Sequence, residues 1–100
     1  MAFEIARKIV SGRKAVAALG VAEKLVATAT QCFEVDVCAD TGNTKAIVVG
    51  ALNIVAIPGS QVGSILLPGE VVKMHVDDVN KIWVNAQVNG EAVCYTYYVQ

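Results

Sequence analysis

Apolar and polar residues alternate with a period of two along much of this chain, which is the pattern of a strand with one buried face. The segment 31–40, "QCFEVDVCAD", shows the pattern most clearly. One face carries Phe33, Val35, Val37 and Ala39, and the other carries Glu34, Asp36, Cys38 and Asp40. The pattern predicts a strand whose first set of side chains packs into a core.

Four further strands are predicted downstream. Residues 71–76 and 82–87 alternate in the same way, whereas "AIVVGAL" at 46–52 is β-branched and apolar throughout, as in a strand buried on both faces. The closing strand is "EAVCYTYYV". Turn residues separate these segments: "DTGNTK" at 40–45, Pro68-Gly69 with the residue types of a type II turn, "DDVNK" at 77–81, and Asn89-Gly90, a two-residue hairpin signal.

The first quarter of the chain is less regular. Phe3, Ile5 and Ile9 stand at alternate positions among charged residues, which predicts an edge strand or an extended arm that ends at Gly12. In residues 14–26 the alanine and leucine content favours a helix, but Gly20 at the centre favours two short strands, and we expect the strands. We therefore divide the chain into an N-terminal arm or edge strand (1–12) and one domain (13–100).

Seven or eight short strands with turns between them, and no convincing helix, predict an all-β protein. The spacing of the turns is typical of a small antiparallel β-sandwich, jelly-roll-like in character. The long connection "NIVAIPGSQVGS" is more apolar than an exposed loop. It packs either against a neighbouring molecule or against the sheet.

The composition adds an expectation of partners. Hydrophobic residues make up 55% of the 100 residues and charged residues only 17%, more apolar than an average domain. A spanning helix needs about 20 apolar residues, and the longest run, "AIVVGALNIVAI", is shorter and contains Asn53. We expect no membrane segment and no signal peptide, and instead a large interface in an oligomer or assembly. The net charge of −1 gives no basic bias, so we expect no nucleic-acid binding.

No set of residues at the spacing of an active site is found. His75 and Asp77 share a strand face without further metal ligands, and Glu34 and Asp36 are typical of a solvated edge rather than of paired catalytic carboxylates. The three cysteines, Cys32, Cys38 and Cys94, are interpreted as free thiols in a reducing compartment, although spacing alone permits a Cys38–Cys94 bridge. We therefore expect no catalysis, no cofactor and no metal.

Aromatic residues gather in the last two predicted strands. They are Trp83, Tyr95, Tyr97 and Tyr98; Tyr95 and Tyr97 share a face, and Trp83 points away from the apolar set of its strand. Two interpretations are open: an interface hot spot, or a cross-strand aromatic pair that covers the sheet. With the N-terminal residues, the predicted partner interface comprises Phe3, Ile5, Arg7, Ile9, Trp83, Tyr95, Tyr97 and Tyr98.

The stretches "CFEVDVCADTGNTKAIVVG" and "GSILLPGEVVKMHVDDVNKIWVNAQVNGEAVCYTYYV" resemble small virion proteins of tailed bacteriophages, in particular head decoration (cement) proteins. The resemblance implies a jelly-roll-like sandwich, a homotrimer, and the major capsid protein as partner. It places the chain on the capsid surface after assembly in the host cytoplasm. A neck, tail or head-fibre-base protein is the alternative, and a carbohydrate-binding sandwich that stacks sugars on Trp83 and the tyrosines is a third hypothesis.

Overall fold

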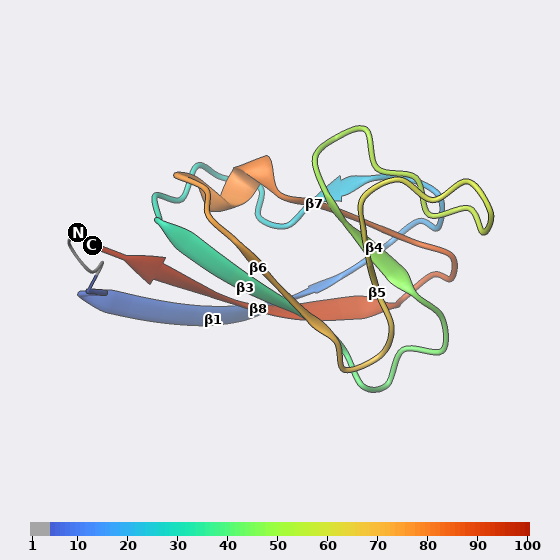
Figure 1. Cartoon of the computed structure of the whole chain (residues 1–100), viewed down its shortest axis with the longest axis horizontal. Coiled ribbons are helices and arrows are strands. Elements are labelled where there is room, and N and C mark those ends of the chain that lie inside the picture. Colours follow the sequence, from blue (N-terminus) through green and yellow to red (C-terminus); the bar gives the residue numbers. More distant parts are fainter. Residues whose placement is uncertain (1–4) are drawn as a thin grey trace.

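The structure, a computed structural model, describes residues 5–100, and its strands form two four-stranded antiparallel sheets that pack against each other (Figure 1). The larger sheet has the order β1 (Lys8–Ala15), β8 (Ala92–Val99), β3 (Glu34–Ala39), β6 (Val71–Met74). The second sheet has the order β2 (Glu23–Lys24), β7 (Trp83–Ala86), β4 (Ile47–Gly50), β5 (Ser64–Leu66). The prediction of an all-β chain with antiparallel sheets is confirmed, and the arrangement is that of a small β-sandwich.

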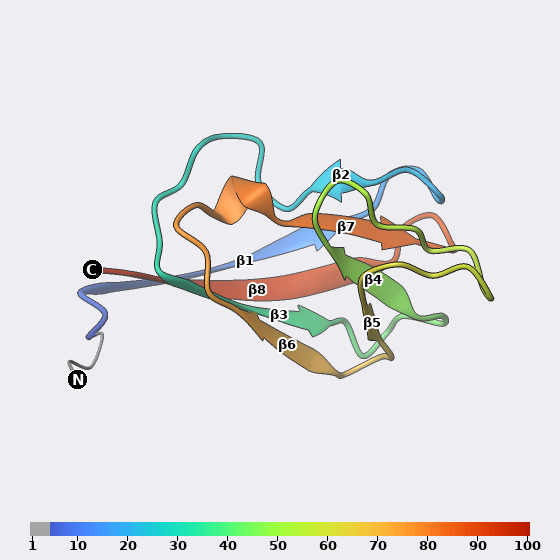
Figure 2. The ribbon, with the colours of Figure 1, turned by 45° about the horizontal axis from the view of Figure 1, so that its top comes forward.

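Successive strands alternate between the two sheets along most of the chain. Only β4 and β5 are both consecutive in the described chain and paired with each other. The first strand, β1, pairs over its whole length with the last, β8, from Lys8 opposite Val99 to Ala15 opposite Ala92. Figure 2 shows the connections that pass from one sheet to the other at the ends of the strands.

The core lies between the sheets and is built by the period-two pattern. Val35, Val37 and Ala39 of β3 are fully buried, as predicted, while the residues between them are only partly covered. The prediction that Phe33 joins them is wrong, because Phe33 precedes β3, is half-buried and packs its ring against Tyr98 at 6.4 Å between centroids instead of entering the core cluster. Facing residues of the second sheet complete the cluster: Ile47, Val49, Val84 and Ala86. Each valine removed from water contributes roughly 1.5–3 kcal/mol to stability, so this cluster is the main source of sheet-to-sheet adhesion.

β4 is buried on both faces, as its continuous apolar sequence predicts. Val48 points away from the main core into a second, smaller cluster with Ile54 and Ala56. The segment 51–63 therefore lies against the outer face of the second sheet, which answers why "NIVAIPGSQ" is so apolar. Gly50 and Gly63 make this approach close, because a Cβ at either position would lie 2.7–2.8 Å from the Cγ2 of Ile54.

The predicted end of the first segment at Gly12 is wrong. β1 continues to Ala15, and Gly12 stands opposite Tyr95 with the phenol ring lying across the space that a side chain would fill. A glycine inside a strand can mark a site where another group approaches the backbone closely. In residues 14–26 the preference for strands over a helix is confirmed by the end of β1 and by β2, with Gly20 at φ +76° between them.

The two-residue hairpin predicted at Asn89-Gly90 is also wrong. β7 and β8 belong to different sheets, so the chain turns at Gly90 (φ +84°) but crosses over instead of pairing with itself. The backbone N–H of Gly90 donates to the carbonyl of Val16, which ties the turn to the end of β1. The pairing of strands in sheets is a long-range property that the turn dipeptide does not encode.

The other three predicted turns are present. In "DTGNTK" the N–H of Asn43 donates to the carbonyl of Asp40 at 3.0 Å. At Pro68-Gly69 the N–H of Glu70 donates to the carbonyl of Leu67 at 2.9 Å, with Gly69 at φ +87°. The "DDVNK" turn contains the short 3₁₀ helix η1 (Val79–Lys81), capped by Asp78, whose carboxylate accepts from the N–H groups of Asn80 and Thr30. These hydrogen bonds lower the pKa of Asp78.

The contact between Gly50 and Ile54 gives a test of the covered outer face. We expect Gly50→Ala to lower the free energy of unfolding by about 1–3 kcal/mol, because the added methyl overpacks against Ile54. The same change in an Ile54→Ala background should cost clearly less. Chemical denaturation of the two single variants and the double variant measures this coupling.

Gly42→Ala is the matched control, because an added Cβ there would meet its nearest atom, an oxygen of Asp40, at an ordinary 3.5 Å. It should change the stability little. Equal losses for Gly50→Ala with and without Ile54 would contradict the close packing described above.

Candidate interaction surfaces

The N-terminal residues predicted for the interface lie at one end of the larger sheet. Phe3 falls outside the described residues. Ile5 and Ile9 are 76% and 63% exposed, and Arg7 is exposed as well, with its backbone N–H donating to the carbonyl of Val99 at 2.7 Å. Two large aliphatic side chains and a cation are thus presented to solvent beside the C-terminal end of β8.

Trp83 lies on the outer face of the second sheet, opposite to Ile82 and Val84, as the alternation predicts. Its ring is half-buried because it packs against the cluster of Val48, Ile54 and Ala56 under the segment 51–63. The ammonium of Lys24 stands 5.7 Å from the ring centroid, within the range of a cation–π contact. The ring of Trp83 therefore makes most of its contacts with other residues of the same chain.

The tyrosines of β8 lie on two different faces. Tyr95 and Tyr97 share the inner face, where their rings stack at 6.3 Å between centroids and pack against the core. Tyr98 lies on the outer face and donates a hydrogen bond to Asp36 at 3.0 Å, which together with burial raises the pKa of Tyr98. The structure does not bring Trp83 and the three tyrosines together on one surface.

The outer face of the larger sheet is polar. Glu34 lies 3.6 Å from the ammonium of Lys73 and 3.9 Å from Nδ1 of the exposed His75. Within residues 5–100 no three histidine, cysteine or acidic side chains come together as a metal site would require.

Cys38 and Cys94 stand directly opposite each other on β3 and β8 as free thiols. Burial raises the pKa of the third cysteine, Cys32.

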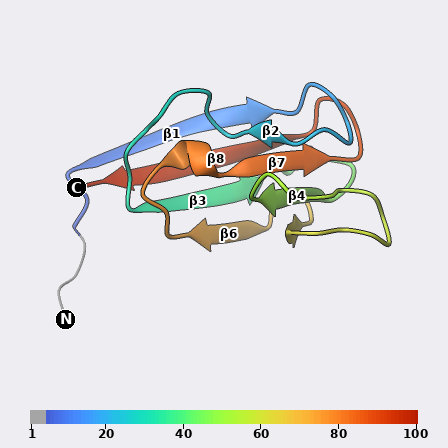
Figure 3. The ribbon, with the colours of Figure 1, turned by 90° about the horizontal axis from the view of Figure 1, so that it is seen from above.

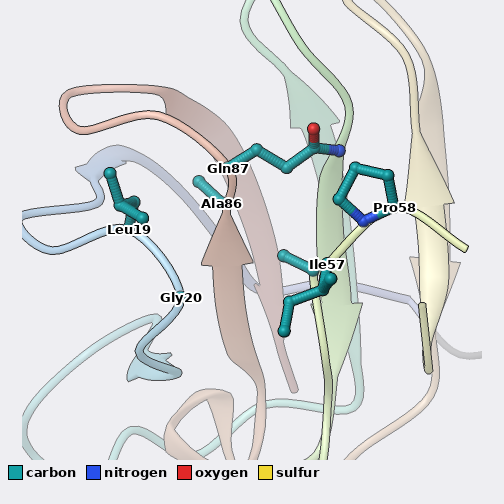
Figure 4. A pocket seen from close by; sticks show the side chains of 7 residues that line it. Leu19, Gly20, Ile57, Pro58, Ala86 and Gln87 are labelled. Carbon is teal, nitrogen blue, oxygen red and sulfur yellow. The ribbon is translucent and has the colours of Figure 1, made fainter. Parts of the chain in front are cut away.

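Figure 4 shows a pocket that sequence reasoning missed. One of its walls is the segment 51–63, which lies at the end of the molecule away from the start of β1 (Figure 1). Its volume is about 210 Å³. It opens where the loop after β1, the tip of the segment 51–63 and the end of β7 meet. The lining residues are Leu19, Gly20, Ala56, Ile57, Pro58, Ala86 and Gln87.

One wall of the pocket is the loop after β1, which is held by hydrogen bonds from both sides. The carboxylate of Glu23 accepts from the N–H groups of Ala17 and Ala18 at 3.0 Å and pairs with Lys14 at 2.9 Å. The N–H of Leu19 donates to the side-chain oxygen of Asn89 at 2.7 Å, and that of Gly20 to the carbonyl of Ala86. The loop is fixed although it is exposed.

The opposite wall is a small hairpin within the segment 51–63. Val55 and Val62 exchange backbone hydrogen bonds of 3.1 and 3.0 Å, and the N–H of Ser60 donates to the carbonyl of Ile57. Pro58 and Gly59 occupy the centre of this turn, with Gly59 at φ +84°. The turn presents Ile57 at the pocket rim with 61% of its surface exposed.

The chemistry of the pocket suits an apolar side chain of another molecule. No lining residue is charged, and Leu19 and Ile57 at the rim are 53% and 61% exposed. The volume is below the roughly 300–1,000 Å³ of small-molecule sites. The sequence signal for this surface was the occurrence of leucine and isoleucine next to glycine and proline in loops, "ALGV" and "AIPG", but their proximity depends on the fold.

Comparison of the chain with protein-family models, curated proteins and solved structures finds no match. In residues 5–100 no helix is long and apolar enough to pass through a lipid bilayer.

The role of Glu23 in fixing the pocket wall is testable. We expect Glu23→Gln to lower the free energy of unfolding by roughly 1 kcal/mol, since hydrogen bonds to a charged acceptor are the stronger ones. The amides of Ala17 and Ala18 should exchange with solvent faster, as measured by NMR. Glu70→Gln, which alters a carboxylate bonded to the N–H of Leu67, should leave those two amides unchanged.

Acid should reproduce the Glu23→Gln effect. Burial raises the pKa of Glu23, but the hydrogen bonds from Lys14 and the two amides outweigh it and lower the pKa overall. A carboxylate with a lowered folded-state pKa stabilises the fold above its unfolded value of about 4, and this stability is lost as the pH falls further. The exchange rates of the Ala17 and Ala18 amides at acid pH are corrected for their intrinsic pH dependence. If these amides still exchanged slowly, this role of Glu23 would be contradicted.

Proposed function

We propose that this protein acts without catalysis, by binding other protein subunits through apolar surfaces at the two ends of the sandwich. The observation that carries the proposal is the pocket rimmed by the exposed Leu19 and Ile57. Ile5 and Ile9 expose further apolar area at the other end. Large aliphatic side chains that are exposed at fixed positions are typical of interface anchors, and an apolar pocket is typical of a site that receives such an anchor.

We further propose that the fold is a jelly roll. The orders β1-β8-β3-β6 and β2-β7-β4-β5, with almost every connection crossing between the sheets, support this assignment. An eight-stranded double sheet with two Greek keys occurs in viral capsid and lectin domains. The strand order therefore supports the more specific proposal of a phage capsid decoration protein, which rests otherwise on the resemblance in sequence.

In this proposal the protein, as a homotrimer, lies over junctions between major capsid proteins and adds buried area across them. An interface of about 1,600 Å² is enough for stable association, and repetition over the shell adds avidity. The N-terminal residues would grip one neighbour as an arm. The pocket would receive an apolar side chain of another.

A protein partner is favoured over a sugar by the placement of the aromatic residues. A carbohydrate site of the kind considered above needs Trp83 and the tyrosines on one accessible platform. Trp83 is instead half-buried under the segment 51–63, and Tyr95 and Tyr97 face the core. The neck, tail or fibre-base alternative uses the same surfaces and differs in copy number.

Copy number is the test of the virion assignment. Quantitative mass spectrometry of purified phage particles should give this chain in a simple ratio to the major capsid protein. A few copies per particle would move the protein to the neck, tail or fibre, and its absence from particles would refute the virion proposal.

The N-terminal grip has its own test. β1 begins at Lys8, so removal of residues 1–7 leaves every β1–β8 pair in place and should leave the thermal unfolding temperature within a few degrees of the full chain. Binding to capsids lacking the protein should be lost, as measured by co-sedimentation. Ile65→Ala, at an exposed position on β5, serves as the matched loss of apolar surface and should bind normally. Undiminished binding after the truncation would contradict the arm.

A further inference from the structure

The outer edge of β1 is not paired with any strand of residues 5–100. β1 is the outermost strand of the larger sheet, with β8 on one side only (Figure 3). It is eight residues long, whereas the other outermost strands, β6, β2 and β5, have four, two and three residues. Short edge strands protect a sheet against further pairing, and β1 lacks that protection.

The hydrogen-bond pattern identifies which backbone groups are free. Val16 donates to the carbonyl of Glu91, so the even-numbered residues of β1 point their N–H and C=O groups at β8. The bonds of Ala92 confirm the phase. Its N–H and C=O bond Asn43, and its C=O also accepts from Asp40, on the side of β8 away from β1. The groups that point to the open edge belong to Ile9, Ser11, Arg13 and Ala15.

Nothing within residues 5–100 covers this edge. The four residues with free backbone groups are all exposed. The register with β8 runs unbroken from Lys8 to Ala15, so no bulge turns the edge away, and no proline occurs in the strand. A strand of another chain could therefore add to β1 by the same backbone bonding that joins β1 to β8.

The charge of β1 determines which strand fits. Residues 7–15, "RKIVSGRKA", carry four cations and no acid. Arg13 and Lys14 pair with Asp40 and Glu23, whereas Arg7 and Lys8 are exposed and make no ion pair with the described residues. Pairing of β1 with β1 of a second copy would place like charges opposite one another, which destabilises a sheet. An acidic strand would gain attraction instead.

We propose that the open edge of β1 binds an extended acidic segment of another protein, which adds to the larger sheet as a further strand. The segment alternates small apolar or β-branched residues with Glu or Asp. Its carboxylates therefore share one face and lie beside Arg7 or, in the register shifted by one residue, beside Lys8. This inference goes beyond the proposed function and holds whether or not the partner is a capsid protein. If the cations serve only to prevent aggregation at the edge, the edge will not bind an acidic segment.

A capped eight-residue peptide of alternating Val and Glu is the probe, and the same peptide with Lys for Glu is the control. Amide hydrogen exchange followed by NMR on the full chain reads the result residue by residue. With the acidic peptide, the amides of Ile9, Ser11, Arg13 and Ala15 should become protected. The even-numbered amides of β1, already bonded to β8, should change little.

Two variants separate backbone pairing from charge. Ser11→Pro removes one edge N–H at a position where an edge strand tolerates proline, and Ser11→Ala keeps that N–H. The proline variant should lose binding and the alanine variant should retain it. Arg7→Glu with Lys8→Glu should weaken binding on the order of tenfold or more, whereas Lys45→Glu, exposed on the loop after β3, should not.

The charge variants keep the test decisive even if Ser11→Pro fails to fold. Equal binding of the acidic and basic peptides, or protection at residues away from β1, would overturn the proposal. So would protection of the same four amides by added unlabelled copies of the chain, because that would show that the edge takes a second copy. A positive peptide result with no copies in virions would support this inference while refuting the virion assignment.

Discussion

The larger sheet depends on β8, which pairs with β1 along one edge and with β3 along the other. Alternate residues of β8 direct their backbone hydrogen bonds to β1 and to β3. β8 is the last strand of the chain, and its partners lie in the first half of the sequence. The sheet is therefore closed only when the C-terminal residues have returned to the N-terminal ones. Pairings of such high sequence separation make folding slow, because the entropy of loop closure is lost before the contacts form.

The two faces of the second sheet explain much of the unusual composition. Its inner face joins the main core, and its outer face carries a second cluster around Val48, closed by Ile54 and half-covering Trp83. Two glycines, Gly50 and Gly63, allow the covering segment to lie this close. This small sandwich thereby buries apolar side chains in two layers, one between the sheets and one under the covering segment, instead of one. The apolar residues that remain exposed are concentrated in loops and at the chain end.

Local pattern predicted the strands well because burial follows the alternation of side chains. The clearest case is β3, where the buried Val35 and Val37 alternate with the partly exposed Glu34 and Asp36. The turn at Pro68-Gly69 follows from its residue types alone. Two predictions that depend on long-range contacts were wrong. The chain at Asn89-Gly90 crosses between the sheets instead of forming a hairpin, and Gly12 lies inside β1 under the ring of Tyr95 instead of ending the strand. The pocket was missed for the same reason. Leu19, Ile57 and Ala86 are distant in sequence, and only the crossing connections bring them together.

The antiparallel pairing of Lys8 with Val99 places the start of β1 and the end of β8 side by side, at the end of the sandwich away from the tip of the segment 51–63 (Figure 1). Adjacent ends of this kind are tolerant of being joined, and exposed turns are tolerant of being opened. A short linker from Val99 to Lys8, with a new start at the Pro58-Gly59 turn, would give a circular permutant with the same sheets. In that rearranged chain β8 and β1 become neighbours in sequence as well as in space, so the pairing that is most distant in the natural order becomes a local one.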